Sequence, residues 1–136
     1  MARSVDELAA RLAASPIYDL LGVAIVAAGD GEVHMELACD RRHANVDGVV
    51  HGGLLAFVAD TAMGLAIRTQ IVPGWHIKTL DLSIEFVRGA RQDDRLAVVA
   101  RVDESSRRFR WASARLEAGG ALVARARSLN LVAAPR

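Results

Sequence analysis

The stretch "NVDGVVHGGLLAFVADTAMGLAI" at residues 45–67 contains the most apolar segment of the chain, residues 52–67, and one carboxylate, Asp60, stands in the middle of that segment. Burying an unpaired carboxylate is costly, so such a residue is usually exposed, partnered or kept for chemistry. If this stretch is helical, the side chains beside the carboxylate belong to Ala56, Phe57, Met63 and Gly64. None of them can pair with it. Asp60 is therefore a candidate general base or nucleophile, and the alternative is that it points to solvent or caps a loop.

The sequence "HGG" at residues 51–53 lies where a polar loop becomes this apolar segment. The first turn of a helix has free backbone N–H groups and a partial positive charge, so Gly52 and Gly53 could hold an oxyanion. Donors of this kind are worth about 3 to 4 kcal/mol each when charge develops on a carbonyl oxygen. The alternative is that the two glycines only permit a sharp turn.

The spacing of these groups suggests a site made by two subunits. Gly53 and Asp60 are seven residues apart, which corresponds to roughly 10 to 11 Å along one helix. A bound carbonyl and the water that attacks it must lie about 3 Å apart. The two groups fit one reaction centre better if Asp60 comes from the antiparallel helix of a second subunit, so the site would straddle a dimer interface.

The elements that must position these residues follow from the pattern of apolar residues, glycines and prolines. A short amphipathic helix is expected within residues 1–20, before a break at Pro16. Two β-branched runs around "GDG" at 29–31 predict a hairpin over 22–38. A loop at 39–51 and a helix over 52–70 follow, and then strands over 76–87, 96–103, 108–117 and 122–131. This order predicts a single α+β domain of residues 1–136, in which one antiparallel sheet wraps one apolar helix.

Composition narrows the function further. The 17 basic and 16 acidic residues nearly cancel, and the arginines are spread along the chain, which argues against a nucleic-acid partner. Cys39 is the only cysteine, so no internal disulfide can form and a reducing cytoplasm is the simplest compartment. The N-terminal residues lack the pattern of a signal peptide, and the apolar segment 52–67 is too short to span a membrane.

Other catalytic and metal-binding patterns do not occur. His34, His43, His51 and His76 lack the spacing of a metal site, and we expect no metal. Neither a GxSxG elbow nor a nucleotide-binding glycine motif occurs. Cys39 has no obvious base nearby, so it is expected to be an inert small residue.

The motif "N…G..HGG......DTAMG", formed by Asn45, Gly48, residues 51–53 and residues 60–64, resembles the hotdog-fold acyl-CoA thioesterases of the PaaI-like, phenylacetic acid degradation type. The stretch "LDLSIEFVRGARQDDRL" is also similar to theirs, and the resemblance covers nearly the whole chain. It implies a hotdog fold, with an antiparallel sheet around one long central helix. By this resemblance, Gly52 donates its amide to the thioester carbonyl with help from Asn45.

The resemblance further implies that Asp60 of the facing subunit activates water or attacks the carbonyl, and that Thr79 helps to orient the water. His51 either contacts the substrate or holds the loop by hydrogen bonds, and Gly53 lies beside it. The arginines that could bind the phosphates of coenzyme A are Arg88, Arg107 and Arg108, unless they are only solvated surface charges. The expected partner is an acyl-CoA or aryl-CoA substrate, with no other cofactor, in at least a homodimer and by resemblance a homotetramer.

Two other functions remain open on the sequence. A hotdog-fold acyl-thioester dehydratase or hydratase would act on similar substrates, although those relatives place a catalytic histidine differently. A non-catalytic acyl-CoA-binding module would keep the fold without turnover. Release of free thiol from a panel of acyl-CoA esters separates the three, because only a hydrolase liberates coenzyme A.

Overall fold

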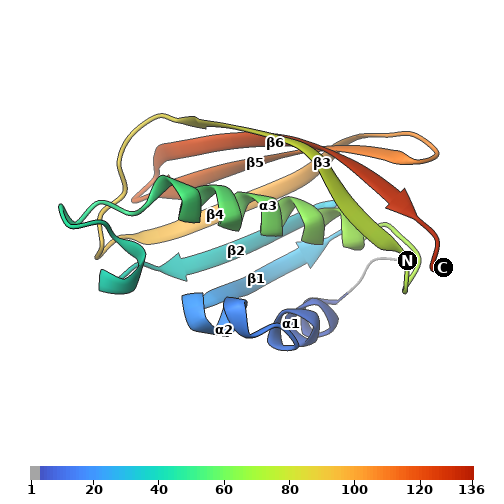
Figure 1. Cartoon of the computed structure of the whole chain (residues 1–136), viewed down its shortest axis with the longest axis horizontal. Coiled ribbons are helices and arrows are strands. Elements are labelled where there is room, and N and C mark those ends of the chain that lie inside the picture. Colours follow the sequence, from blue (N-terminus) through green and yellow to red (C-terminus); the bar gives the residue numbers. More distant parts are fainter. Residues whose placement is uncertain (1–3) are drawn as a thin grey trace.

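The computed structural model describes residues 4–136 and contains one antiparallel sheet that curls around one long helix (Figure 1). The helix is α3 (Gly52–Arg68). The strands are β1 (Val23–Gly29), β2 (Glu32–Ala38), β3 (His76–Phe86), β4 (Arg95–Ser105), β5 (Phe109–Ala118) and β6 (Ala121–Ala133). Their order across the sheet is β1-β2-β4-β5-β6-β3. This arrangement confirms the α+β architecture predicted from the sequence.

The core lies between α3 and the concave face of the sheet. Nine residues of α3 are buried, and they meet alternate residues of the central strands, where each second side chain points inward. The inward side chains of β4 and β5 include Leu96, Val98, Ala114 and Leu116. Small residues such as Ala59 and Ala62 let the helix approach the sheet closely, because a larger side chain would hold the two apart.

Helix α3 ends at Arg68 rather than at residue 70, and Thr69 is the C-cap, whose backbone N–H still donates to the Leu65 carbonyl at 3.2 Å. The Thr69 hydroxyl donates to the Ala66 carbonyl at 2.7 Å and accepts from the Gly31 N–H, also at 2.7 Å. Gly31 lies in the β1–β2 turn with φ of 79°, a conformation that favours glycine. Thr69 therefore ties the end of the helix to the predicted hairpin.

The N-terminal segment contains two helices, α1 (Val5–Ala13) and α2 (Pro16–Leu21), where the sequence predicted one helix and a break. Pro16 does interrupt the first helix, but it also begins the second, since the first helical position needs no N–H donor. Ser4 and Glu7 form a capping box that begins α1. Residues 1–3 of the expected helical segment lie outside the described residues.

Strand β3 forms one edge of the sheet and pairs only with β6 among the described strands. A bulge between Thr79 and Asp81 interrupts this pairing. Several large apolar side chains on or next to β3 are exposed, at 49% for Leu80, 56% for Phe86 and 47% for Val87. Exposed apolar groups beside an unpaired strand edge are typical of a surface that another chain covers.

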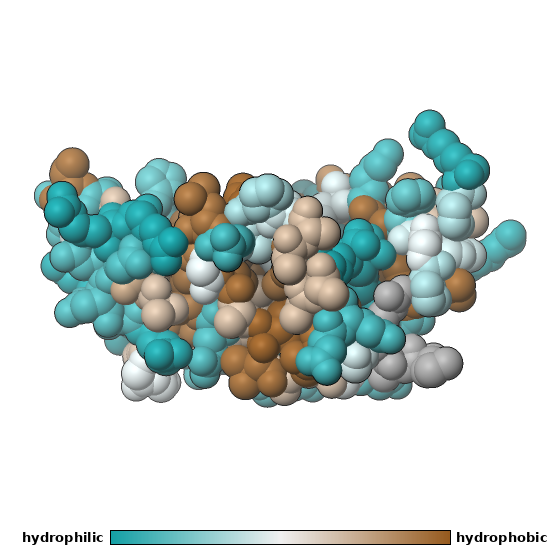
Figure 2. Space-filling model, turned by 90° about the horizontal axis from the view of Figure 1, so that it is seen from below, coloured by the Kyte–Doolittle hydropathy of each residue, from teal (hydrophilic) through white to brown (hydrophobic). Residues whose placement is uncertain are grey.

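The face that carries α1 and α2 is seen in Figure 2, where apolar surface gathers near the middle between hydrophilic margins. Helix α2 lies against this region of the fold, with the Tyr18 ring 5.6 Å from the Phe57 ring of α3. Among residues 4–136, no helix is both long and apolar enough to cross a membrane.

Candidate active site

Asp60 lies half-buried on α3, and its partner comes from strand β3. The Thr79 hydroxyl donates a hydrogen bond to Asp60 Oδ1 at 2.8 Å. Thr79 stands at the bulge in β3, so the irregular register directs its hydroxyl to the helix. The Asp60 carboxylate thus has a hydrogen-bond partner from outside its own helix, and this bond holds one of its oxygens in a fixed orientation.

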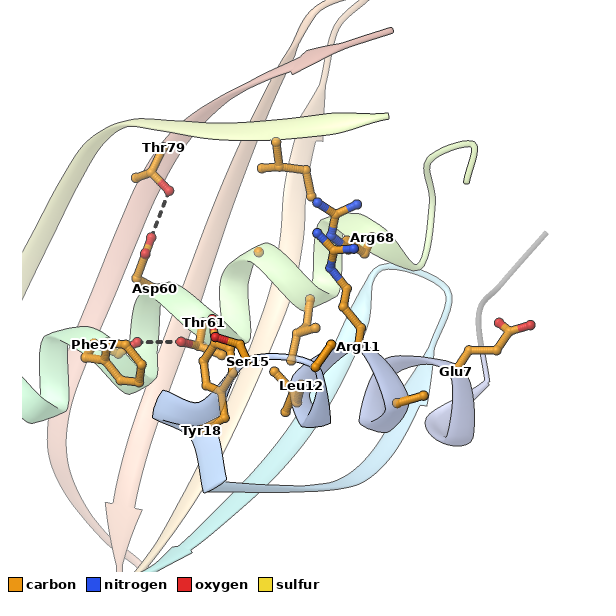
Figure 3. Close-up of a pocket in the computed structure, with 15 residues that line it drawn as sticks. Glu7, Arg11, Leu12, Ser15, Tyr18, Phe57, Asp60, Thr61, Arg68 and Thr79 are labelled. Carbon is orange, nitrogen blue, oxygen red and sulfur yellow. Dashed lines mark hydrogen bonds between the residues drawn. The ribbon is translucent and has the colours of Figure 1, made fainter. Parts of the chain in front are cut away.

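Asp60 and Thr79 line a cavity of about 790 Å³ between α3, β3 and the N-terminal helices (Figure 3). Helix α3 contributes residues from one face, at the spacing of successive helical turns. The lining side chains and backbone of α3 belong to Phe57, Asp60, Thr61, Gly64, Leu65 and Arg68. Helices α1 and α2 form the opposite wall, which includes Arg11, Leu12 and Tyr18. A cavity of this size can hold a small organic group next to a carboxylate.

The start of α3 has one backbone donor available for a ligand. The Gly52 N–H meets no acceptor within residues 4–136, as expected for the first turn of a helix. A Cβ at this position would lie 3.2 Å from Cζ of Phe86, so a larger residue here would crowd the Phe86 ring. Gly52 can therefore present its amide to a carbonyl oxygen.

The other residues of the HGG motif cap the helix. His51 Nδ1 accepts a hydrogen bond from the Gly53 N–H at 2.9 Å, so this amide already has a partner. The His51 backbone N–H donates to the His43 carbonyl at 2.9 Å, which fixes the approach of the loop. Of the two alternatives for His51, the structure shows the loop-holding one, and its exposed ring leaves Nε2 able to meet a ligand.

Asn45 shapes the loop that leads into α3. Its side-chain oxygen accepts hydrogen bonds from the Asp47 N–H at 3.0 Å and from the Val49 N–H at 3.1 Å. The chain reverses here through Gly48, whose φ is 76°. The amide oxygen of Asn45 is thus used inside the loop, and only its Nδ2 group can assist in binding a substrate.

The structure does not bring Gly52 and Asp60 together within one chain. The cavity that contains Asp60 includes neither Gly52 nor Asn45. Gly52 and Asp60 are eight positions apart along α3, which is about 12 Å of helix. The two predicted groups therefore lie at different places along the same helix.

The three arginines expected to hold coenzyme A phosphates lie at opposite ends of the sheet. Arg88 follows β3, and its Nε donates to the Leu122 carbonyl at 2.9 Å near the start of β6. Arg107 and Arg108 belong to the β4–β5 turn, where the Arg108 carbonyl accepts from Val132 near the end of β6. Within one chain these three side chains cannot share one diphosphate, because the length of β6 separates them.

Several residues of the cavity were missed by the sequence analysis. Gly64 and Arg68 follow Asp60 at helical spacing, so the periodicity of α3 could have identified them. Arg11 and Tyr18 come from the N-terminal helices. No local pattern in the sequence indicates that those helices cover this part of α3.

Cys39 is not equipped for nucleophilic chemistry. Burial of the thiol, together with the nearby negative charges of Asp94 and Asp40, raises its pKa to about 11. The thiol is therefore protonated at neutral pH, when only the thiolate is a nucleophile. Within residues 4–136, no three His, Cys, Asp or Glu side chains gather where they could hold a metal ion.

Comparisons with known proteins agree with this geometry. Residues 47–127 match the family model of the thioesterase superfamily. A Pseudomonas aeruginosa protein named as an esterase is 38% identical over 113 residues, which cover 82% of this chain and 84% of the relative. Human acyl-coenzyme A thioesterase 13 is 28% identical, with 77% of this chain and 76% of the relative covered.

A solved structure shares the whole fold. It is a variant of the phenylacetic acid degradation protein PaaI from Thermus thermophilus, which superposes with a TM-score of 0.79 at 25% identity. The superposition covers 86% of this chain and 98% of that protein. The similarity thus extends over most of the fold.

Proposed function

The chain belongs to the thioesterase superfamily and is a hotdog-fold thioester hydrolase, and from this premise we propose that it hydrolyses acyl-CoA or aryl-CoA thioesters at a site shared by two subunits. The observation that carries the proposal is the Asp60 carboxylate, held by Thr79 at the wall of a cavity large enough for an acyl group. The names of the human and Thermus thermophilus relatives, an acyl-coenzyme A thioesterase and a phenylacetic acid degradation protein, support this substrate class.

The proposed reaction uses a backbone amide and a carboxylate. The thioester carbonyl oxygen accepts a hydrogen bond from the Gly52 N–H, which stabilises the negative charge that develops on this oxygen. Asp60 of the other subunit takes a proton from water as the water oxygen attacks the carbonyl carbon. The C–S bond then breaks, the sulfur leaves as the thiolate of coenzyme A, and a proton returns to it.

The carboxylate could instead act as the nucleophile. Asp60 would then form a mixed anhydride with the acyl group as coenzyme A leaves, and water would hydrolyse this anhydride. A single turnover in ¹⁸O-labelled water separates the two routes. Direct attack by water puts the label only in the acid product, whereas attack of water on the aspartyl carbonyl of the anhydride leaves it in Asp60.

The shared site is supported by the separation of Gly52 and Asp60 along α3 and by the unpaired edge of the sheet. A second copy that pairs along β3 would cover Leu80 and Phe86, which are exposed in the single chain. In this arrangement the α3 helices of the two subunits would lie antiparallel, so that Gly52 of the partner subunit could approach Asp60. We propose at least a homodimer and, by pairing of dimers, a homotetramer that works in the cytoplasm.

The main experiment measures the release of free thiol from a panel of acyl-CoA and aryl-CoA esters. Asp60→Asn should lower kcat about a hundredfold or more with little change in KM, the usual scale for removal of a general base. Asp81→Asn is a matched control, since Asp81 is exposed on the same edge strand and does not line the cavity. Near-normal turnover by a folded Asp60→Asn enzyme would remove Asp60 from the mechanism.

A mixing experiment tests whether two subunits build each site. Asp60→Asn subunits are combined with Gly52→Leu subunits, each inactive alone and each shown to form the same oligomer. A mixed dimer holds both lesions in one site and none in the other, so random exchange should restore about a quarter of the wild-type activity. Absence of recovery after proven exchange would mean that each site lies within one chain.

A further inference from the structure

The cavity beside Asp60 continues along α3 toward two arginines. Figure 3 shows Asp60 and Thr79 at one end and the guanidinium groups of Arg11 and Arg68 farther along, both pointing into the cavity. Arg11 comes from α1 and Arg68 from the last turn of α3. A ligand at this end of the cavity therefore lies beside two positively charged side chains.

The floor between these two ends is open because Gly64 has no side chain. A Cβ at this position would meet no atom within 4 Å, so the space next to the helix is not filled by the chain. Gly64 lies one helical turn beyond Asp60 and one before Arg68. A narrow group bound at Asp60 can therefore extend over Gly64 toward the arginines.

The arginine end is a built site rather than a patch of surface charge. Arg68 is only 9% exposed, and its guanidinium donates to the Trp75 carbonyl at 3.1 Å, which fixes its direction. Arg11 is exposed and adds a second guanidinium. Glu7 also lines the cavity, one helical turn before Arg11, and its carboxylate accepts the Ser4 N–H at 3.2 Å in the capping box of α1.

We propose that this cavity selects acyl groups whose far end carries a carboxylate, so that the preferred substrates are the CoA monothioesters of dicarboxylic acids. This inference rests on the proposed thioesterase function and assigns its substrate class. The thioester carbonyl lies at Asp60, the methylene chain passes over Gly64, and the terminal carboxylate binds between Arg11 and Arg68. Guanidinium groups bind carboxylates by paired, charge-assisted hydrogen bonds.

The length of the cavity favours the acyl end over the phosphates of coenzyme A. Asp60 and Arg68 are eight residues apart on α3, which is about 12 Å along the helix axis before either side chain is counted. A dicarboxylic acyl chain of medium length spans this gap. The phosphates of coenzyme A are separated from the thioester by the longer pantetheine arm.

The test compares pairs of substrates that differ only at the far end of the acyl chain. The wild-type enzyme is assayed with adipyl-CoA against hexanoyl-CoA and with suberyl-CoA against octanoyl-CoA. A charge-assisted pair at a partly exposed site predicts kcat/KM about tenfold higher for the member with the terminal carboxylate. Arg11→Gln should lower kcat/KM for the dicarboxylic esters about tenfold relative to the neutral ones and so remove this preference, whereas Arg101→Gln, at an exposed arginine on β4 outside the cavity, should keep it.

Each other outcome overturns the proposal. Equal or faster hydrolysis of the neutral chains by the wild-type enzyme would mean that the arginines do not bind the acyl end. An equal rise in KM for all four substrates in Arg11→Gln would assign this arginine to the phosphates of coenzyme A. Failure of every ester in the panel to release thiol would instead refute the proposed hydrolase chemistry, and the substrate class with it.

A second variant does not depend on removing a charge. Gly64→Leu places a side chain in the open floor of the cavity, where the chain itself leaves room for it. It should lower kcat/KM for suberyl-CoA at least tenfold more than that for acetyl-CoA, whose acyl group ends before this position. Loss of both activities together, in a folded protein, would place the acyl chain elsewhere.

Discussion

Replacement of Gly64 by alanine should make the protein more stable and less able to accept long substrates. Gly64 lies inside α3, its φ is not positive, and an added Cβ meets nothing within 4 Å. Glycine is less favourable than alanine inside a helix by about 0.8 to 1.0 kcal/mol. Because the structure offers neither a clash nor strain to offset this gain, the full difference should appear in the free energy of unfolding.

The size of the effect can be measured by urea unfolding. An increase of about 1 kcal/mol in the free energy of unfolding should raise the urea concentration at the unfolding midpoint and leave the dependence of that free energy on urea unchanged. It should raise Tm by roughly 3 to 5 °C for a chain of this length. Gly31→Ala serves as the opposite case, because φ is 79° and the added Cβ would lie 2.6 Å from Gln70 Nε2. That variant should lose stability by more than Gly64→Ala gains.

The activity of Gly64→Ala should show the cost of this stabilisation. One methyl group narrows the floor of the cavity without closing it, so kcat/KM for suberyl-CoA should fall while that for acetyl-CoA stays constant. A loss of stability in Gly64→Ala would refute the reasoning, because it would mean that another surface, such as a second subunit, already fills the space beside the helix.

The capping histidine, the loop asparagine and the buried thiol lead to three further predictions. His51→Ala should lower the free energy of unfolding by about 1 kcal/mol and His51→Asn by less, measured by urea unfolding, because asparagine can still cap the Gly53 N–H. Asn45→Asp keeps the side-chain oxygen that accepts the two loop N–H groups, whereas Asn45→Ala removes it. If only Asn45→Ala loses turnover, Asn45 acts by holding the loop. If both variants lose turnover equally, its Nδ2 group binds the substrate. Cys39 should react slowly with iodoacetamide in the native protein, and its reaction rate should rise with pH until about pH 11, because burial raises the pKa of the thiol to about 11. In urea the rate should level off near the ordinary thiol pKa. Fast labelling of the native protein at neutral pH would show that the thiol is accessible.

Much of the fold could be predicted because its signals are local. The hairpin around Gly31 follows from its turn residues, and the four later strands from their alternation of apolar and polar residues. The start of α3 at Gly52 was predicted from the change in composition. The second N-terminal helix was missed because Pro16 was treated only as a helix breaker, although proline also favours the first turn of a helix.

The candidate site was predictable only where its residues share one element. Asp60 was singled out because its helix offers no partner, and the spacing from Gly53 suggested a shared site. The hydrogen bond from Thr79 depends on a bulge in β3, and the wall formed by Arg11 depends on how α1 docks. Tertiary contacts of this kind leave no periodic signal in a single sequence.

The position of β3 at the far edge of the sheet has a consequence for how the protein folds. Strand β3 is synthesised before β4 and β5, but it pairs only with β6, which spans Ala121–Ala133. Closure of this long loop must therefore wait until β6 has been synthesised. Since Thr79 reaches Asp60 from β3, the orientation of the carboxylate is completed in the same late step, and truncation within β6 would leave both edges of β3 unpaired and the cavity without one of its walls.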